Sequence, residues 1–578
     1  MEQQKKLWAA KIAGALNAII IKNNISGVSI NEVDLVIETP PNPELGDLAF
    51  PMFPFAKIFR TAPAAIAKLV EAEIASPNAA MAGPYINIKI DYAGAASALT
   101  DIIKQGAEYG SSDIFSAKKI MIEFSCPNTN KPLHLGHLRN NILGESMARI
   151  LKKNGADVMK VNLVNDRGVH ICKSMLAYKK FGEGKTPESQ GQKSDKFVGD
   201  FYIKYNDWSK KDPGAEEQVR EMLIKWENGD PETLALWKKM NDWVISGIQC
   251  TYNKTGISFD RVYFEHETYK LGKAEILKGL ERGIFYKEED GSVWVDLSDI
   301  KLDKKVLLRK DGTSLYLTQD IGTAIARQGD FPFEQLIYVV GSEQDYHFKV
   351  LFHILKKLGF EWADQLYHLS YGMIYLPEGK MKSREGTVVD ADDVIDKLSE
   401  LAIKEIRDKE RESEISDLEE TGLSIALGAL HYFLLQVNPL KDMIFNPAES
   451  ISFNGNTGPY LQYMGARISS MLRKYDEKGI KSEFRPELLV KDEEKELIKL
   501  LLQFPEIVQI AGKNFNPSAI TTFAYNLAKN FSRFYHDVPV LHCGDPQLME
   551  ARIILSRAVL QVLENAYELM AVPFLEKM

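Results

Sequence analysis

The sequence predicts an α/β protein with a parallel-sheet central domain that carries an insertion, an α+β N-terminal domain and an all-α C-terminal domain. Strand-like and helix-like segments alternate from about Lys118, and apolar residues follow a helical period from about Asp390. A chain of 578 residues suits about four structural units. We expect domains at 1–112, 113–450 and 451–578, with the insertion at about 175–300.

Each expected element follows from a local pattern. Residues 1–24 resemble an amphipathic helix and not a signal peptide, because lysines interrupt the apolar stretch. The Pro- and Gly-rich residues 40–57 predict loop and turns, and residues 83–92 alternate as a half-buried strand does. A turn-like 109–113 suits a domain junction.

The central region predicts a right-handed βαβ unit. An apolar strand at 118–124 is followed by a helix, whose C-cap we place at Gly155, and by a strand at 158–164. After the charged insertion, the pattern returns with strands at 336–340 and 369–376 around a helix at 347–359. Beyond it, the clearest helical segments are 397–420 and 551–570.

Composition and charge exclude several classes of protein. The net charge of −9 excludes a uniformly basic nucleic-acid coat and leaves local basic patches possible. The four cysteines, Cys126, Cys172, Cys250 and Cys543, form no CxxC pair, so we expect neither a disulfide framework nor a metal site. Reduced thiols and the lack of a long apolar run favour a soluble cytoplasmic protein that does not bind membranes.

The strongest local signal is the segment CPNTNKPLHLGHLRNN at 126–141, between the first central strand and its helix. Ligands bind beyond the carboxyl ends of parallel strands, and a helix N-terminus favours a phosphate. His134 and His137 could donate hydrogen bonds to an α-phosphate, and Gly136 would let a nucleotide approach the backbone. Incidental histidines at a helix start remain an alternative, and zinc binding is disfavoured by the spacing.

A second signal is the segment GKMKSREGTVV at 379–389, which follows the last predicted strand. Lys380, Lys382 and Arg384 could clamp a triphosphate or pyrophosphate. Alone, such a segment is more often an exposed basic turn. Its order relative to HLGH, across an interrupted parallel sheet, favours the phosphate site.

HLGH and KMKSR resemble the HIGH and KMSKS signatures of class I aminoacyl-tRNA synthetases. Longer stretches, among them IEFSCPNTNKPLHLGHLRNNILGESMARIL, LYLTQDIGTAIAR, IYVVGSEQDYH and NTGPYLQYMGARISSML, resemble the arginyl-tRNA synthetase family over nearly the whole chain. The resemblance implies a Rossmann-like catalytic domain and a helical anticodon-binding bundle. It implies ATP-dependent activation of L-arginine with Mg²⁺, transfer to tRNA(Arg), no binding of DNA, a monomer, and activation that waits for tRNA.

The resemblance also implies roles for individual residues. His134, Gly136 and His137 would stabilise the transition state, and Lys131, Lys380 and Lys382 would balance the pyrophosphate charge. The expected ATP-binding residues are His134, Gly136, His137, Gly372, Met373, Lys380, Met381, Lys382 and Ser383. The fourth KMSKS position, normally lysine, is Ser383 here, and Lys131 stands where a compensating lysine lies in such members.

Arginine's guanidinium needs a planar pair of acceptors, which a carboxylate supplies best and which a lysine substrate would not match. The resemblance places Tyr316 and Asp320 against the guanidinium. It places Glu123, Asn128, His137 and Gln344 around the amino-acid backbone and its polar neighbours, with Cys126 and Pro127 lining the same site.

Tyr460, Tyr463 and Arg467 lie at helical spacing, so they share one face. An aromatic stripe of this kind is more often helix core, but within this family it indicates tRNA binding through stacking and phosphate contact. The N-terminal domain resembles the module that contacts the corner of the tRNA.

Three alternatives remain open from the sequence. A related class I synthetase of the cysteinyl type would need zinc-binding cysteines. A small-molecule nucleotidyltransferase would not need the flanking domains. A non-catalytic RNA-binding paralogue would be favoured by loss of HLGH or Asp320, and the altered KMKSR segment is the only feature that favours it.

Overall fold

The computed structural model describes residues 2–313, 315–375, 377, 389–479 and 482–578. It forms two compact units. The smaller contains Met1–Tyr109, Met471–Ile507 and Asn526–Leu563, and the larger contains Gly110–Ser470, Val508–Tyr525 and Glu564–Met578. Every helix in the described residues is too short or too polar to cross a membrane.

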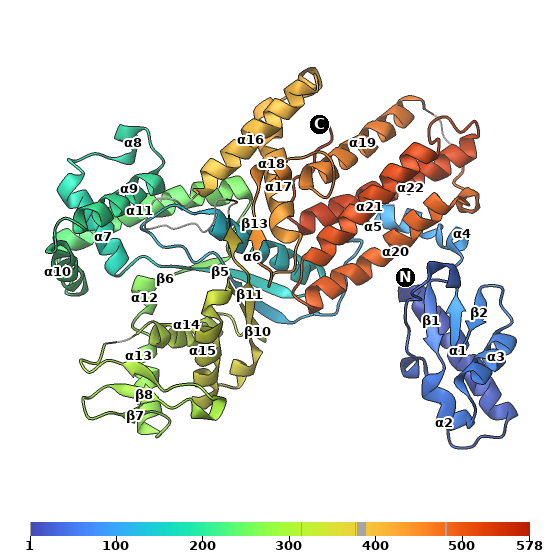
Figure 1. Ribbon diagram of the computed structural model, residues 1–578, viewed down its shortest axis with the longest axis horizontal. Coiled ribbons are helices and arrows are strands. Elements are labelled where there is room, and N and C mark those ends of the chain that lie inside the picture. The colour runs from blue at the N-terminus through green and yellow to red at the C-terminus, as the bar shows by residue number, and fades with distance from the viewer. Residues whose placement is uncertain (1, 314, 376, 378–388, 480–481) are drawn as a thin grey trace. The chain divides into compact units, whose positions relative to one another are not determined.

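A five-stranded parallel sheet forms the centre of the larger unit, in the order β11–β10–β4–β5–β6 (Figure 1). The strands are β4 (Lys119–Glu123), β5 (Asp157–Val164), β6 (Arg261–Phe264), β10 (Gln335–Gly341) and β11 (Leu366–Tyr371). The chain proceeds outward from β4 to β6 and then crosses to β10 on the other side. The boundary between β4 and β10 is therefore the topological switch point, where such sheets bind ligands. The predicted α/β class is confirmed.

Helices connect the strands as the βαβ pattern predicts. α6 (Leu135–Lys153) links β4 to β5, and α14 (Tyr316–Asp330) and α15 (Asp345–Lys357) flank β10. The C-cap of α6 is Asn154, one residue before the predicted Gly155, and Gly155 follows it at a φ of +91°, a left-handed conformation that suits a glycine just after a helix end.

Strand β6 lies inside the range in which we expected the insertion. The segment before it folds as helices, α7 (Val169–Phe181), α9 (Ser194–Ser209), α10 (Ala215–Glu227) and α11 (Pro231–Thr255). The segment after it holds α13 (Gly272–Glu281) and the antiparallel strands β7 (Tyr286–Lys287), β8 (Val293–Val295) and β9 (Lys305–Leu308). Sequence reasoning missed β6 because only Tyr263 among its four residues is buried, so its apolar signal is weak.

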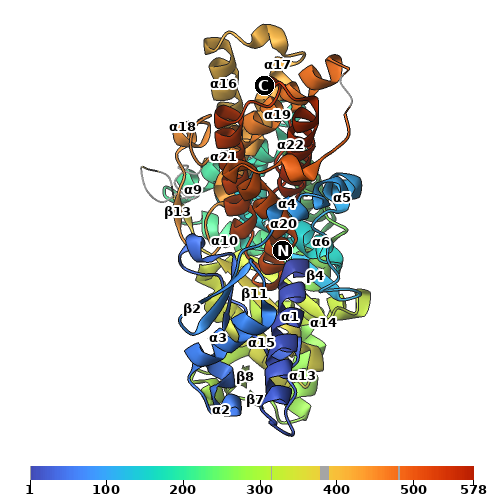
Figure 2. The same cartoon turned by 90° about the vertical axis from the view of Figure 1, so that its right-hand side faces the viewer.

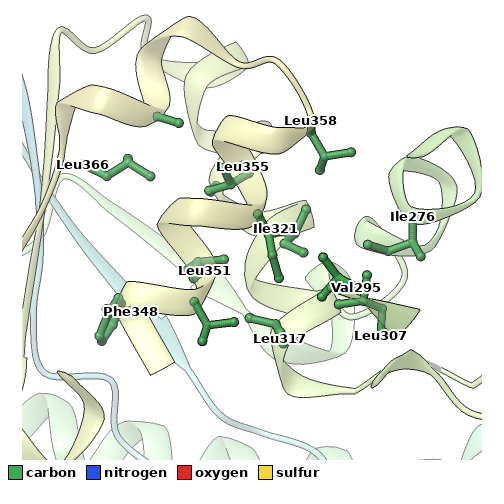
Figure 3. Close-up of a cluster of buried hydrophobic side chains, with 14 of the residues drawn as sticks. Ile276, Val295, Leu307, Leu317, Ile321, Phe348, Leu351, Leu355, Leu358 and Leu366 are labelled. Carbon is green, nitrogen blue, oxygen red and sulfur yellow. The ribbon is translucent and has the colours of Figure 1, made fainter. Parts of the chain in front are cut away.

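A buried apolar cluster fixes α14 in the larger unit (Figure 3). Leu317 and Ile321 of α14 meet side chains from α13, from the small sheet and from α15. These are Ile276, Val295, Leu307, Leu351 and Leu355. Burial of each such side chain contributes about 1.5–3 kcal/mol, so the position of α14 is well determined.

Two predictions after β10 were wrong in detail. Residues 369–376 are not one strand, because β11 ends at Tyr371 and the short β12 (Ile374–Tyr375) pairs with β13 (Met443–Ile444). Residues 397–420 are not one helix, since α16 (Ala391–Asp408) stops before Glu410, whose φ is +56°, and α17 (Leu418–Leu435) begins afresh with Asp417 as its N-cap.

The smaller unit combines the N-terminal segment with parts of the C-terminal helices. α1 (Glu2–Lys22), the predicted helix, lies beside α3 (Pro63–Ile74) in both views (Figures 1 and 2). The sheet has the order β1 (Leu48–Pro51), β3 (Tyr85–Ile88), β2 (Ala79–Ala82). Strand β1 contradicts the prediction of loop for 40–57: its four residues are buried and pair with β3.

The C-terminal helices of this unit are parts of α19 (Gly458–Glu477), α20 (Asp492–Lys513), α21 (Ser518–Asp537) and α22 (Pro546–Leu569). Tyr109 joins the N-terminal segment to α20, because its hydroxyl donates to the Leu501 carbonyl at 2.8 Å and its ring stacks on Phe504. Lys499 of α20 forms an ion pair with Asp47 at 3.0 Å.

Candidate active site

A tight turn follows β4 at the switch point. Ser125 and Cys126 have φ values of +76° and +47°, a left-handed conformation that costs of order 1–3 kcal/mol for each such residue. Two buried amides hold it. Asn140 accepts from the Ser125 N–H, and Asn162 accepts from the Cys126 N–H at 3.0 Å. The Asn140 amide also donates to the Val339 carbonyl at 2.6 Å, so the turn is tied to β10.

The two histidines of HLGH have defined tautomers. The Gly136 N–H donates to His134 Nδ1, and the His134 N–H donates to His137 Nδ1, both at 3.1 Å. A backbone N–H can only donate, so each Nδ1 is an acceptor and each neutral ring carries its proton on Nε2. Burial, assisted by the Lys131 charge, lowers the pKa of His134 to about 3, and burial with the nearby His134 and Lys131 lowers the pKa of His137 well below its usual value.

Gly136 is required by the same geometry. A Cβ at this position would lie 3.0 Å from His134 Cε1 and 3.1 Å from its Nδ1. Any side chain there would displace the imidazole that caps α6. Gly136 therefore leaves room for the His134 ring, in addition to the room that it would leave for a bound ligand.

A cavity of about 550 Å³ opens over these residues. It is lined by Cys126, His134, Gly136, His137 and Met373, together with Ser125, Asn140, Val339, Val340, Gly341, Glu343, Tyr371, Ile374 and Tyr375. The volume suits a nucleotide. The structure thus brings together the expected ATP-binding residues that it describes, except Gly372.

Gly372 and Met373 have their backbone donors engaged within the protein. The Gly372 N–H donates to the Pro439 carbonyl at 2.9 Å, and the Met373 N–H donates to Asp442 Oδ1 at 2.7 Å. Buried Arg139 of α6 fixes this segment by donating to the carbonyls of Met373, Pro439 and Lys441. The side chain of Met373, which is 37% exposed, is then available for contact with a nucleotide base.

A second cavity, of about 190 Å³, holds the acidic groups. It is lined by Glu123, Asp320 and Gln344, as well as Leu163, Thr323, Arg327, Tyr338, Val340, His347, Phe348 and Leu351. Asp320 Oδ2 accepts a hydrogen bond from His347 Nε2 at 2.7 Å. Val340 lines both cavities, so this acidic cavity adjoins the larger cavity over His134 and His137, which is called the nucleotide cavity below because its volume suits a nucleotide.

Sequence reasoning missed Arg327, whose buried guanidinium forms an ion pair with Glu123. The spacing could have found it, since positions 320, 323 and 327 fall on one helical face. Two predicted residues lie apart from Asp320. Tyr316 is 72% exposed and lines a third cavity, of about 590 Å³, and Asn128 bridges the backbone of Asn165 beyond the turn.

The remaining predicted residues lie in other places. Lys131 is half-buried in the loop before α6, and burial lowers its pKa. Lys380, Met381, Lys382 and Ser383 lie outside the described residues. Tyr460, Tyr463 and Arg467 are half-buried on one face of α19, where Tyr460 contacts Tyr525 and Tyr463 contacts Arg411.

Comparison with known proteins gives matches along the whole chain. Family models match at residues 6–90 (arginyl tRNA synthetase N terminal domain), 98–447 (tRNA synthetases class I (R), catalytic domain) and 461–578 (DALR anticodon binding domain). The arginine–tRNA ligases of Treponema denticola and Treponema pallidum are 58% and 52% identical, each covering 100% of both chains.

Solved structures show the same fold. The arginyl-tRNA synthetase of Thermus thermophilus matches with a TM-score of 0.81 and 24% identity, covering 99% of this chain and 100% of that one. Family models match the N-terminal, the central and the C-terminal part of the chain, which disfavours a small-molecule nucleotidyltransferase without the flanking domains. The chain belongs to the arginyl-tRNA synthetase family of class I aminoacyl-tRNA synthetases.

Proposed function

We propose that this chain joins L-arginine to tRNA(Arg), and that its two adjoining cavities carry out the activation step. Arginine and ATP would form arginyl-adenylate and pyrophosphate, and the terminal adenosine hydroxyl of the tRNA would then attack the adenylate carbonyl. The observation that carries the proposal is the direct junction, at Val340, of a cavity with two neutral histidine donors and a cavity with paired acids. This junction suits a carboxylate meeting an α-phosphate.

In the nucleotide cavity, the Nε2–H groups of His134 and His137 would donate to the charge that develops on the α-phosphate. Adenine would lie against the Met373 side chain near Gly372. Lys131, with Lys380 and Lys382, would balance the departing pyrophosphate, and Met381 and Ser383 would belong to the same ATP-binding segment. Neutral histidines suit this role, because each keeps its donor over the whole physiological pH range.

Mg²⁺ would be held chiefly by the phosphates of ATP. No group of three or more His, Cys, Asp or Glu residues in the described part of the chain could hold a metal ion. Magnesium commonly takes phosphate and water ligands with few from protein, so this donor set fits an ion that arrives with ATP. The ion would supply neutralisation of phosphate charge.

In the acidic cavity, Asp320 would pair with the guanidinium, and Tyr316, which lines the third cavity from the start of the same helix, would have to turn toward it. Glu123 and Gln344 of this cavity, His137 of the adjoining one and Asn128 beyond the turn would contact the rest of the amino acid, and Cys126 and Pro127 would line its path. The ion pair with Arg327 holds the Glu123 carboxylate in a fixed position, which supports its use as a substrate contact. A lysine substrate would leave one acceptor of Asp320 unpaired, at a cost of about 1–3 kcal/mol.

For the tRNA, Tyr463 and Arg467 would contact unstacked bases and phosphates, with Tyr460 beside them, and the N-terminal domain would contact its corner. The half-exposure of all three residues supports this assignment, because a purely core stripe would be buried. We further propose a cytoplasmic monomer that activates arginine only when tRNA is bound.

Pyrophosphate exchange into ATP tests this proposal. Each of the twenty amino acids is assayed with and without total tRNA. We expect exchange with arginine alone, and only when tRNA is present. Exchange without tRNA would retain the substrate and contradict the coupling, whereas tight tRNA binding without exchange would indicate a non-catalytic paralogue.

A further inference from the structure

Lys193, the residue before α9, joins polar groups from three helices. Its Nζ lies 2.8 Å from Asp195 Oδ2 on α9, 2.6 Å from Thr251 Oγ1 on α11 and 2.6 Å from Asp392 Oδ2 on α16. The Thr251 hydroxyl also donates to Asp392 at 2.8 Å. Asp195 and Thr251 are fully buried, so the Lys193 cation neutralises the Asp195 carboxylate at a place that water does not reach.

Asp392 lies in the first turn of α16, and the residues just before it pair with the HLGH segment. The Leu135 N–H donates to the Val389 carbonyl at 3.3 Å, and the Ala391 N–H donates to the Leu133 carbonyl at 2.9 Å. His134 therefore faces Asp390 across an antiparallel bridge. Anything that shifts the start of α16 shifts the backbone of His134.

Helix α9 also contacts the other side of the same loop. A Cβ at Gly199 would lie 2.8 Å from Pro132 Cδ and 3.5 Å from Lys131 Cα, so the helix backbone packs directly on the loop. Helix α9 is in turn fixed to α11, since a Cβ at Gly247 would lie 2.5 Å from the Asp195 carboxyl carbon. The loop before α6 is thus held between α9 and α16, and Lys193 connects these two helices.

We propose that Lys193 is a positioning residue for ATP. By fixing the start of α16 against α9 and α11, it determines where His134 presents its Nε2–H to the α-phosphate. This inference rests on the role proposed above for His134. Without the cation, the carboxylates of Asp195 and Asp392 would repel each other, and Lys254, 3.6 Å from Asp392, is a more distant substitute.

The test compares Lys193→Met and Lys193→Arg with Lys196→Met, a matched control on α9. Lys196 pairs with Asp393 of α16 at 3.0 Å, but both side chains are exposed. In tRNA-supported pyrophosphate exchange, we expect Lys193→Met to lower kcat/KM for ATP at least tenfold and to leave the KM for arginine within twofold. Lys193→Arg should retain most of the activity, and the control should match the wild type.

The arginine KM is the informative readout, because the acidic cavity is built from other elements and contains none of the cluster. If Lys193→Met does not fold, Asp392→Asn keeps the question answerable, since it removes the ion pair that ties α16 to Lys193 without leaving two unpaired carboxylates, and it should give an ATP-selective loss in the same direction. An unchanged kcat/KM for ATP, or equal losses for ATP and arginine that follow a lower Tm, would overturn the proposal. A wild type that shows no arginine-dependent exchange would instead contradict the proposed function itself.

Discussion

His134 combines two tasks that can be separated by mutation. Its Nδ1 caps α6 by accepting from the Gly136 N–H, and the residue lines the cavity of about 550 Å³, where we propose that its Nε2–H donates to the α-phosphate. Asparagine is a strong N-cap whose oxygen takes the place of Nδ1, but it has no atom at the place of Nε2. The cap and the proposed phosphate donor are therefore different atoms of one ring.

We expect His134→Asn to lower kcat for pyrophosphate exchange by about 10²–10³-fold, the usual cost of one transition-state donor. The Tm should stay within a few degrees of the wild type, because the cap is retained. Exchange kinetics and calorimetry measure the two effects. Unaltered exchange would show that Nε2 does not contact the transition state, and a large fall in Tm would show that the cap was not preserved.

His431 of α17 gives a pH-dependent contribution to stability. It is buried, its Nδ1 lies 2.6 Å from the Ala571 carbonyl, and burial lowers its pKa to about 4. Between that value and the unfolded pKa of about 6.5, the unfolded chain binds more protons than the folded one. The contribution is present above pH 6.5 and is lost as the pH falls through 4, with a size on the order of 3 kcal/mol.

We therefore expect His431→Asn, which keeps a donor for Ala571 but cannot titrate, to reduce the dependence of the urea midpoint on pH between 4 and 6.5. His536→Asn is the control, because that side chain is 89% exposed. Equal pH dependence in His431→Asn and the wild type would contradict this assignment.

At the residue level, residue types and motifs single out candidate site residues, whereas contacts between buried residues appear only in the folded structure. HLGH and Asp320 were identifiable because their chemistry is visible in the residue types. The pairing of Glu123 with Arg327 was not, since it joins β4 to α14 across the sheet. Likewise, only the folded backbone shows that Ser125 and Cys126 are left-handed, because neither is a residue type that favours that conformation.

At the level of elements, α14 carries Asp320 to the acidic cavity, and the position of this helix depends on two glycines. A Cβ at Gly322 would lie 2.2 Å from the Gly272 nitrogen of α13, and one at Gly272 would lie 1.7 Å from the Thr318 carbonyl oxygen. The backbones of α13 and α14 therefore touch. No side chain fits between them.

We expect Gly322→Ala to move α14 and raise the KM for arginine about tenfold or more, since a displacement of 1 Å at a binding site can cost about 10²-fold. Gly329→Ala, on the same helix with no atom within 4 Å, is the matched control and should leave the KM unchanged. Steady-state exchange kinetics measure both. Equal KM values would show that the helix absorbs the added methyl group.

Elements with strong apolar periodicity were predicted well, and short ones were not. α1, α15 and the strands β4, β5 and β10 follow clear patterns. β1 was missed because prolines flank it, although Pro51 is tolerated as the last residue of the strand. The break between α16 and α17 was missed because its charged residues resemble a solvated helix face.

At the level of the whole molecule, a net charge of −9 must still allow binding of a polyanion. Local basic groups then supply the attraction, and their counterion release makes affinity fall as salt rises. Composition alone predicts this requirement for local basic groups. Where those groups gather could not be predicted from the sequence, because it depends on which helices share a surface.

We expect the Kd for tRNA(Arg) to rise at least tenfold between about 50 and 200 mM KCl, as a few phosphate contacts would require. Arg467→Gln should reduce the slope of log Kd against log salt by about one. Fluorescence titration at several salt concentrations measures this. A Kd independent of salt would contradict a phosphate-contacting interface, and an unchanged slope would remove Arg467 from it.

The contact between Tyr109 and Leu501 has a consequence for biosynthesis. The N-terminal segment is synthesised before α20, the helix to which Tyr109 is bound and which begins only at Asp492. At about 5–20 residues per second, synthesis of the intervening chain takes roughly 20–80 s. During that interval, the Tyr109 ring has no Phe504 to stack on. The N-terminal segment is therefore made long before the helix that completes its packing.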